Sequence, residues 1–231
     1  MPPERTYVSI GNLDRRMYRT SQRRFGMMIP GTAVIGISLG GLLDGTTALG
    51  VVTNANDADG RAKNFLSAGG GANQCGLDGA IYAITQTRWN ARLWMRFKLN
   101  QIVTQRFWAG LFSASPLGAD SLVAGAIQSV GLRASTTAAI ANFVAYSSSA
   151  VAENISNFPV AVPADAAVHD LIITIKNAGA GVTIQLDNQA VSFLANLPAI
   201  AQDMGFCLAI QEQAIVAKNM RIYYAEIETD R

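Results

Sequence analysis

The sequence predicts an all-β protein, folded as an antiparallel sandwich of two sheets. Apolar and polar residues alternate with a period of two in many short segments, whereas patterns with the period of an α-helix are scarce. Turn-forming residues separate these segments at short intervals, which is typical of sandwiches built from many short strands. The chain has 231 residues, of which 50% are apolar, so it is long and apolar enough to fill such a core.

The clearest strand is expected over residues 91–99. Apolar residues occupy every second position there, and Trp94 falls on the opposite, polar face. The aromatic-rich segment 106–113 is expected to be a second strand. The short polar stretch 100–104 between them predicts that the two strands form a hairpin.

Other segments repeat the same alternation between shorter turns. The Ala-rich stretch Ser135–Ala145 is ambiguous, because it suits a short helix or two weak strands with Phe143 and Tyr146 inside. Loops are expected at residues 54–64, 67–74, 177–181 and 187–189. Further strands are expected at residues 7–10, 32–39, 48–52, 80–87, 169–176, 182–186, 190–194, 206–210 and 220–228.

Positive charge gathers near the N-terminus. Residues 1–115 carry 13 Lys and Arg against 6 Asp and Glu, a net charge of +7, and residues 116–231 carry 5 against 10, a net charge of −5. Arginine is frequent in packed interfaces, so we interpret the densest cluster as a contact between subunits; a solvated basic loop stays open as the alternative. Nucleic acid is not expected, since few aromatic residues lie near these arginines. The cluster consists of Arg15, Arg16, Arg19, Arg23 and Arg24.

The middle of the chain carries almost no charge. Between Phe107 and Ala164 the only charged residues are Asp120, Arg133 and Glu153. A segment of this composition would lower solubility if it lay on the surface. We therefore expect part of it in the core and part of it covered by other subunits.

Five strand-like segments, in this order, resemble the concanavalin A-like lectin/glucanase sandwich, in the versions found in structural proteins of tailed bacteriophages and related viruses. The resemblance covers about residues 80–231 and implies a jelly-roll-like sandwich. The segments are WMRF at residues 94–97, FWAGLF at 107–112, VHDLIITI at 168–175, VTIQLDN at 182–188 and MRIYYAEI at 220–227.

The resemblance implies a virion structural protein. We expect residues 1–30 to form a basic N-terminal arm, or extra strands, and residues 31–231 to form the sandwich, best supported from about residue 80. The implied function is capsid decoration or cementing by a homo-oligomer, for which a trimer is one arrangement, in contact with other virion proteins. The alternative is a carbohydrate-binding, receptor-recognition module of a phage tail fibre, with Trp94 stacking on the glycan. Neither function requires a cofactor.

Catalysis is not expected from this sequence. The run Gly36–Gly40 matches the G-x-S-x-G pattern around Ser38, and His169 follows it, but that motif belongs to a strand–turn–helix of a parallel sheet. The glucanase signature E-x-D-x-x-E is absent, and Glu226 and Glu228 are interpreted as a solvated strand end. We therefore assign no catalytic residue and expect that the protein is not an enzyme.

Metal binding and membrane insertion are not expected either. Residues 54–60 hold alternating oxygen ligands but depart from the calcium-loop pattern, so a polar turn is expected. Cys75 and Cys207 are interpreted as buried thiols, and their pairing is left open. The uncharged run 25–43 contains five Gly and Pro30, which favours short strands over a membrane-spanning helix.

Overall fold

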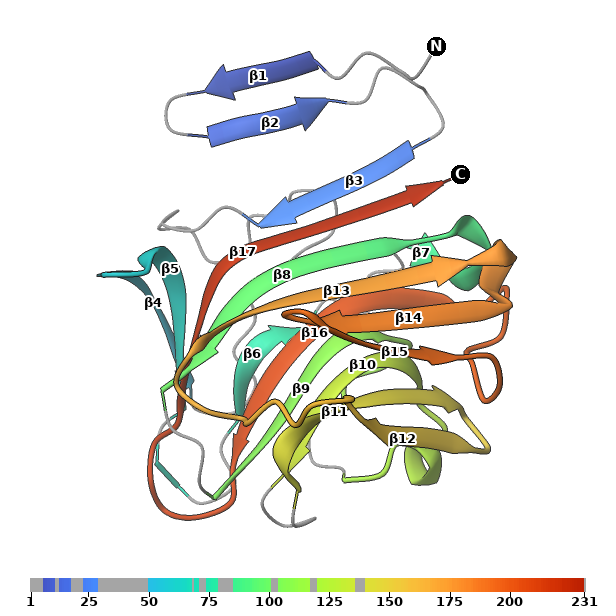
Figure 1. Cartoon of the computed structure of the whole chain (residues 1–231). Coiled ribbons are helices and arrows are strands. Elements are labelled where there is room, and N and C mark those ends of the chain that lie inside the picture. The colour runs from blue at the N-terminus through green and yellow to red at the C-terminus, as the bar shows by residue number, and fades with distance from the viewer. Residues whose placement is uncertain are drawn as a thin grey trace.

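Two antiparallel β-sheets face each other across a single apolar core in the computed structural model, which confirms the predicted fold class (Figure 1). The structure describes residues 6–10, 13–17, 23–28, 50–67, 69–70, 74–78, 85–100, 104–116, 120–135 and 140–230. No helix in this part of the chain has the length and hydrophobicity that a membrane crossing needs.

Seventeen strands and three short 3₁₀ turns make up the described chain. The 3₁₀ turns are η1 (Thr87–Trp89), η2 (Val123–Gly125) and η3 (Asn177–Gly179). The strands are β1 (Thr6–Ile10), β2 (Leu13–Met17), β3 (Arg23–Met28), β4 (Gly50–Asp57), β5 (Gly60–Ser67), β6 (Gln74–Asp78), β7 (Thr85–Gln86), β8 (Arg92–Leu99), β9 (Gln105–Phe112), β10 (Gln128–Ser135), β11 (Ile140–Ser149), β12 (Glu153–Asn157), β13 (Val168–Lys176), β14 (Gly181–Leu186), β15 (Gln189–Phe193), β16 (Asp203–Glu212) and β17 (Asn219–Asp230).

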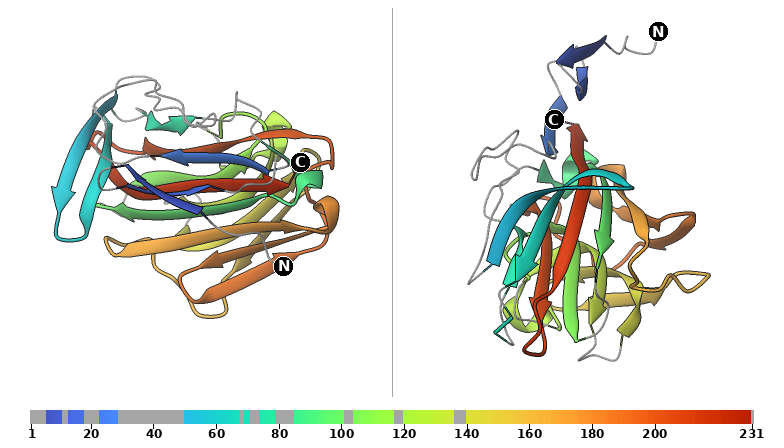
Figure 2. Two further views of the ribbon diagram at one scale, coloured as in Figure 1. Left: turned by 90° about the horizontal axis from the view of Figure 1, so that it is seen from above. Right: turned by 90° about the vertical axis from the view of Figure 1, so that its left-hand side faces the viewer.

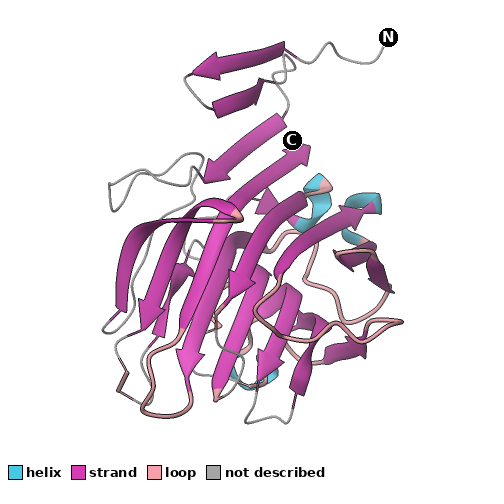
Figure 3. Cartoon of the chain, turned by 60° about the vertical axis from the view of Figure 1, so that its left-hand side comes forward, coloured by secondary structure: helices cyan, strands magenta, loops and turns pink. Residues whose placement is uncertain are grey.

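The two sheets differ in strand order. The seven-stranded sheet runs β12-β11-β10-β9-β16-β6, and β7 also pairs with β16. The eight-stranded sheet runs β15-β14-β13-β8-β17-β5-β4, and β3 pairs with β17. Figure 2 shows the layers from two further directions, with β1 and β2 forming a separate hairpin beside them. Figure 3 shows that strands dominate and that the three helical turns are short.

Alternating side chains fill the space between the sheets. Phe97 of β8 in the eight-stranded sheet stacks on Phe107 of β9 in the seven-stranded sheet, with ring centroids 5.2 Å apart. Phe143 of β11 meets both rings edge-on, each at 5.6 Å. All three side chains are at most 1% exposed. Aromatic pairs of this geometry add to the free energy gained from burying apolar area, so these rings join the two sheets.

The predicted hairpin between residues 91–99 and 106–113 is wrong. β8 pairs with β13 and β17, whereas β9 pairs with β10 and β16. The chain therefore crosses from one sheet to the other between the two strands. Phe97 and Phe107 show the reason: each strand buries its apolar face, and the two faces meet across the core rather than side by side in one sheet.

Two other sequence-based expectations are settled by the strand pairing. The loop expected at residues 54–64 is wrong, since β4 and β5 pair as a hairpin that turns at Ala58 and Asp59. This hairpin lies at the edge of its sheet, where polar side chains can face solvent, so its composition looks like that of a loop. The ambiguous Ala-rich stretch belongs to strands, as β10 and β11 pair with each other and Phe143 and Tyr146 are buried.

The two cysteines lie on neighbouring strands but out of register. Cys75 of β6 is opposite Ile210, whereas Cys207 of β16 is opposite Asp78. Three positions of strand separate them by roughly 10 Å along the sheet. Disulfides require Cα atoms within about 7 Å, so this register does not bring the two cysteines into bonding distance.

Glycines allow the backbones of β9 and β10 to approach closely. Gly110 and Gly131 are opposite each other in the register. A Cβ atom on Gly131 would lie 2.2 Å from the Ala109 carbonyl oxygen, and one on Gly110 would lie 2.3 Å from the Val130 carbonyl oxygen. Both obstacles are backbone atoms, which cannot move aside as a side chain can.

We predict that Gly131→Ala destabilises the protein by about 2–3 kcal/mol, because two central strands must shift apart. Gly125→Ala is the matched control, since its new Cβ would meet only the Ile127 side chain, at 3.4 Å. Urea unfolding of both variants and the parent measures the difference. Equal stability of the two variants would contradict the close approach of β9 and β10.

Candidate functional site

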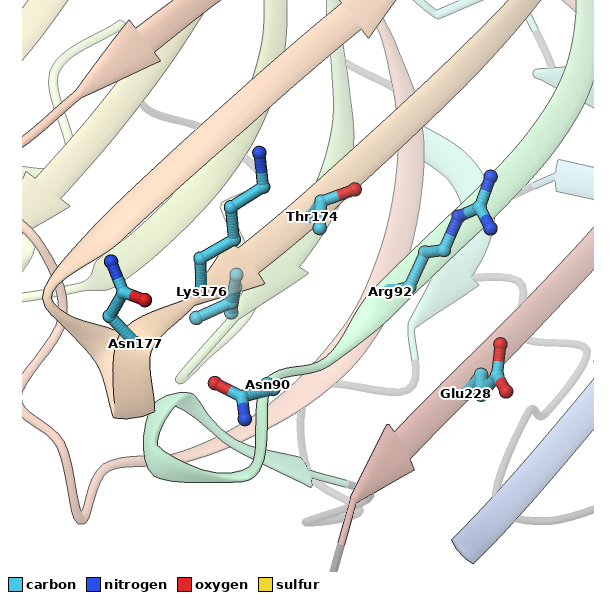
Figure 4. A pocket seen from close by; sticks show the side chains of 7 residues that line it. Asn90, Arg92, Thr174, Lys176, Asn177 and Glu228 are labelled. Atoms are coloured by element: carbon cyan, nitrogen blue, oxygen red, sulfur yellow. The ribbon is translucent and has the colours of Figure 1, made fainter. Parts of the chain in front are cut away.

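An open depression of about 400 Å³ lies on the outer face of the eight-stranded sheet, at the end where β8 begins and β13 ends (Figure 4). Its lining combines amide, hydroxyl, cationic and carboxylate groups, so it can exchange hydrogen bonds with a polar ligand. The lining residues are Asn90, Arg92, Thr174, Ile175, Lys176, Asn177 and Glu228.

Strand alternation places the floor of the depression. Arg92 of β8 is opposite Thr174 of β13 on one side and Glu228 of β17 on the other. These three residues form one row across the sheet, on the face away from the apolar core. Lys176 lies two residues beyond Thr174 on β13 and therefore shares its face, as Figure 4 shows.

The rim of the depression is held in a strained conformation. Asn90, Asn177 and Ala178 all have positive φ angles, of 51°, 54° and 54°. The Asn90 side-chain carbonyl accepts a hydrogen bond from the Ala178 backbone N–H at 2.9 Å, which ties η1 to η3. The left-handed conformation is common for asparagine but costs free energy for Ala178, which has a Cβ atom and no polar side chain that could form a local hydrogen bond. The rim is therefore a preformed structure.

Among the described cations on this face, Arg96, Lys98 and Arg221 have carboxylate partners, whereas Arg92 and Lys176 do not. Arg96 makes two hydrogen bonds to Asp170, at 3.0 and 2.8 Å, which raise the pKa of the guanidinium. Lys98 lies 2.7 Å from Asp59. Among the described residues, Arg92 and Lys176 have no carboxylate within ion-pair distance, and both are exposed.

Trp94 occupies the next row of the same face. It is half-buried, opposite Ile172 of β13 and Glu226 of β17, and its ring meets the Tyr224 ring edge-on at 5.2 Å. Since rows on one face are about 7 Å apart, the indole lies beside the depression. The outward position that the sequence predicts for Trp94 is the observed one.

The chain itself covers part of the outer face of the seven-stranded sheet, around Trp108. Leu122 packs with Trp108, Phe112 and Tyr146, and each of these four side chains is at most 1% exposed. The Leu122 N–H donates a hydrogen bond to the Tyr146 hydroxyl at 3.2 Å. That hydroxyl donates in turn to Glu153, and together with burial this contact raises the pKa of Tyr146.

Asp120 anchors the covering segment, residues 120–127, to this sheet. Arg106 donates two hydrogen bonds to its carboxylate, at 2.8 and 2.7 Å, and Ser135 donates one at 2.6 Å. These bonds and the nearby Arg133 overcome the opposing effect of burial and lower the pKa of Asp120 to about 2. Arg133 is only 4% exposed, with its guanidinium 5.3 Å from the centre of the Trp108 ring.

The single histidine is part of the core. His169 is 3% exposed, with Nδ1 3.0 Å from Asp187 Oδ2 and Nε2 3.2 Å from Asp165 Oδ1. Its ring packs against Phe97 and Phe143, at 5.7 and 5.1 Å. Both ring nitrogens are therefore occupied within the fold, and Ser38, its partner in the G-x-S-x-G hypothesis, lies outside the described residues.

The arginine cluster divides among several elements. Arg15 and Arg16 belong to β2, and Arg19 lies outside the described residues. Arg23 and Arg24 belong to β3, where their backbones are opposite Asp230 and Thr229 of β17. Within the described chain this part of the cluster therefore adds a strand to the sheet, and its role in subunit contacts stays a prediction.

Acidic side chains that the sequence predicts to be exposed are buried or hydrogen-bonded within the fold. Glu226 is 6% exposed, so its interpretation as a solvated strand end is wrong. The reason is that β17 is a central strand, flanked by β8 on one side and by β5 and β3 on the other. Asp57, in the segment that partly matches a calcium loop, accepts hydrogen bonds from Arg221 and Tyr223.

The described residues include no group of three or more His, Cys, Asp and Glu side chains that could hold a metal ion.

Comparison with solved structures shows the fold class. A protein of unknown function from Shewanella oneidensis MR-1 is similar with a TM-score of 0.65 and 12% identity, over 93% of this chain and 89% of that chain. Alginate lyase A1-II′, a member of polysaccharide lyase family 7, has a TM-score of 0.50 and 9% identity, over 77% and 83%. The binding domain of botulinum neurotoxin DC in complex with SialylT has a TM-score of 0.53 and 9% identity, over 90% and 48%. No protein-family model and no curated protein matches the sequence.

These similarities establish a concanavalin A-like sandwich, which confirms the fold part of the resemblance. The structural similarities do not support the viral part of the resemblance, because nothing among these structures indicates a phage or a virus. The prediction that the protein is not an enzyme is corrected here, because alginate lyase A1-II′ has a fold of this kind and the fold therefore does not exclude catalysis. A low histidine content and the absence of the glucanase signature are therefore not sufficient to exclude catalysis in a protein of this fold.

We predict that Asp120→Asn lowers the free energy of unfolding at pH 7 by about 1–3 kcal/mol, because Arg106 and the buried Arg133 lose their carboxylate. The folded-state pKa of Asp120 lies below its usual value of 3.8, so its contribution is complete above about pH 4 and is lost as the pH falls towards 2. Urea unfolding from pH 2 to 7 should therefore show a steeper fall for the parent than for the variant.

Asp59→Asn is the matched control, since its ion pair with Lys98 is more exposed and should contribute less than about 1 kcal/mol. If both variants lose the same stability and follow the same pH profile, Asp120 does not anchor the covering segment.

Proposed function

We propose that the protein binds a carbohydrate on the outer face of the eight-stranded sheet. One observation carries the proposal: an open depression with an amide- and cation-rich lining lies in the row beside the half-buried Trp94. A saccharide has hydroxyl groups that need planar hydrogen-bonding partners and C–H faces that pack on aromatic rings. Asn90 and Asn177 provide amides for the first requirement, and Trp94 provides an aromatic side chain for the second.

In the described chain, Trp94 on this face is half-buried and accessible to a ligand, whereas Trp108 on the other sheet is 1% exposed. The outer face of the seven-stranded sheet also has aromatic rings and cations, but residues 120–127 cover them. The strained rim at Asn90 and Ala178 supports the same choice, because a preformed site loses less conformational entropy when a ligand binds.

Similar structures support this proposal by their chemistry. One is an alginate lyase and another is a toxin binding domain in complex with SialylT, so sandwiches of this class act on or bind saccharides. The same face would serve the predicted receptor-recognition module. Location on a virion and assembly as a homo-oligomer stay predictions, and the exposed Val151, Ile155 and Val160 near the edge strand β12 offer apolar area for such contacts.

We predict that Trp94→Ala lowers glycan affinity about tenfold or more, whereas Trp94→Phe keeps most of it, because stacking needs an aromatic face. A glycan array identifies ligands for the parent, and isothermal titration calorimetry then compares the variants. Ile155→Ala, which removes apolar area from the other sheet, is the control and should bind as the parent does.

Failure of the well-folded parent to bind any glycan on the array would overturn the proposal, and so would an unchanged affinity in Trp94→Ala. Reducing-end measurements on the bound glycans test for cleavage in the same samples. Release of new ends would identify an enzyme that uses this face, and stable glycans would identify a binding module.

A further inference from the structure

Two cations of the depression lack carboxylate partners in the described chain. They indicate the chemical class of the ligand, which the shape of the depression alone does not. Arg92 and Lys176 come from adjacent strands of the sheet and both line the depression. We infer that the saccharide bound there is acidic, and that its carboxylate or sulfate group lies between these two side chains. This inference rests on the proposed carbohydrate-binding function and names the class of its ligand.

The comparison with neighbouring cations on β8 supports the inference. Arg96 and Lys98 have carboxylate partners, Asp170 and Asp59, within the fold. Arg92 has the same outward direction and no carboxylate partner among the described residues, although the acidic Glu228 stands opposite it in the register. An exposed guanidinium keeps all its donors available and can bind a carboxylate or sulfate through two parallel hydrogen bonds.

A second pair of cations in the described chain, Arg106 and Arg133, cannot serve the same purpose. Arg106 donates two hydrogen bonds to Asp120 and a third to Gln211, and Arg133 is buried beneath the covering segment. Both charges are therefore balanced within the fold. The depression combines accessible, unneutralised cations with an aromatic neighbour, Trp94, which a simple anion would not need.

Glu228 sets a limit on how strongly the anion is held. Its carboxylate lines the same depression and repels a negatively charged ligand at short range. Arg92 and Lys176 contribute two positive charges to the lining and Glu228 one negative charge, which favours an acidic sugar while still allowing its release. The amides of Asn90 and Asn177 are neutral and can bind the hydroxyl groups of the same ring.

The test compares matched ligands by isothermal titration calorimetry. An oligouronate, its carboxyl-reduced counterpart and a sulfated oligosaccharide of equal length are titrated into the full chain. The parent should bind the oligouronate or the sulfated ligand at least about tenfold more tightly than the reduced one, and this preference should shrink as salt is raised. The ratio of the two acidic affinities shows which anionic group the site prefers.

Charge variants then locate the preference on the protein. Arg92→Gln and Lys176→Gln should each lower the ratio of acidic-ligand affinity to reduced-ligand affinity about five- to tenfold, because the charge is lost while the side chain can still form hydrogen bonds. Arg92→Lys should restore part of the loss, and Glu228→Gln should raise acidic-ligand affinity about two- to threefold. Lys98→Gln is the control, because that charge is already paired with Asp59.

The outcomes separate this inference from the proposed function. Equal affinity for acidic and reduced ligands, both abolished by Trp94→Ala, would overturn the acidic-sugar inference and keep the carbohydrate-binding function. An acidic preference that Arg92→Gln and Lys176→Gln leave intact would overturn the assignment of these two residues. No binding of any of the three ligands would overturn the acidic-sugar inference, and the glycan array would then decide the carbohydrate-binding function.

Discussion

The contact among Phe97, Phe107 and Phe143 is the interaction on which the rest of the structure depends. These rings come from both sheets and lie 5.2–5.6 Å apart, with almost no exposure. Every strand that contributes to this core must turn its apolar face inward, and its alternate side chains then face outward. The row of Arg92, Thr174 and Glu228 is thus a consequence of core packing.

The two outer faces meet solvent in different ways. One is covered by residues 120–127, which Asp120 and Leu122 hold in place, and the other remains open around Arg92 and Trp94. This difference also explains the low charge between Phe107 and Ala164. β9, β10 and β11 bury side chains on both faces, as central strands covered on both sides do. The chain's own covering segment accounts for much of this burial without a neighbouring subunit.

Local patterns in the sequence predicted the elements better than their partners. Alternation over residues 91–99 identified β8 and placed Trp94 on its outer face, and both are observed. The hairpin at residues 100–104 was wrong, because alternation is the same whether the next strand lies beside β8 or across the core. Glu226 was misplaced for a related reason: a carboxylate near the end of the sequence looks solvated, but its strand is central.

The all-β class, most strand positions and the inward or outward direction of their side chains could be predicted from the amino-acid sequence, because these follow from a period of two and from turn-forming residues. The pairing of the strands, the covering of one outer face and the absence of partners for two described cations could be seen only in the folded chain. These depend on residues far apart in the chain: Asp170 neutralises Arg96, whereas nothing in the described chain neutralises Arg92. The candidate site exists because long-range pairing left that charge, and that of Lys176, beside Trp94.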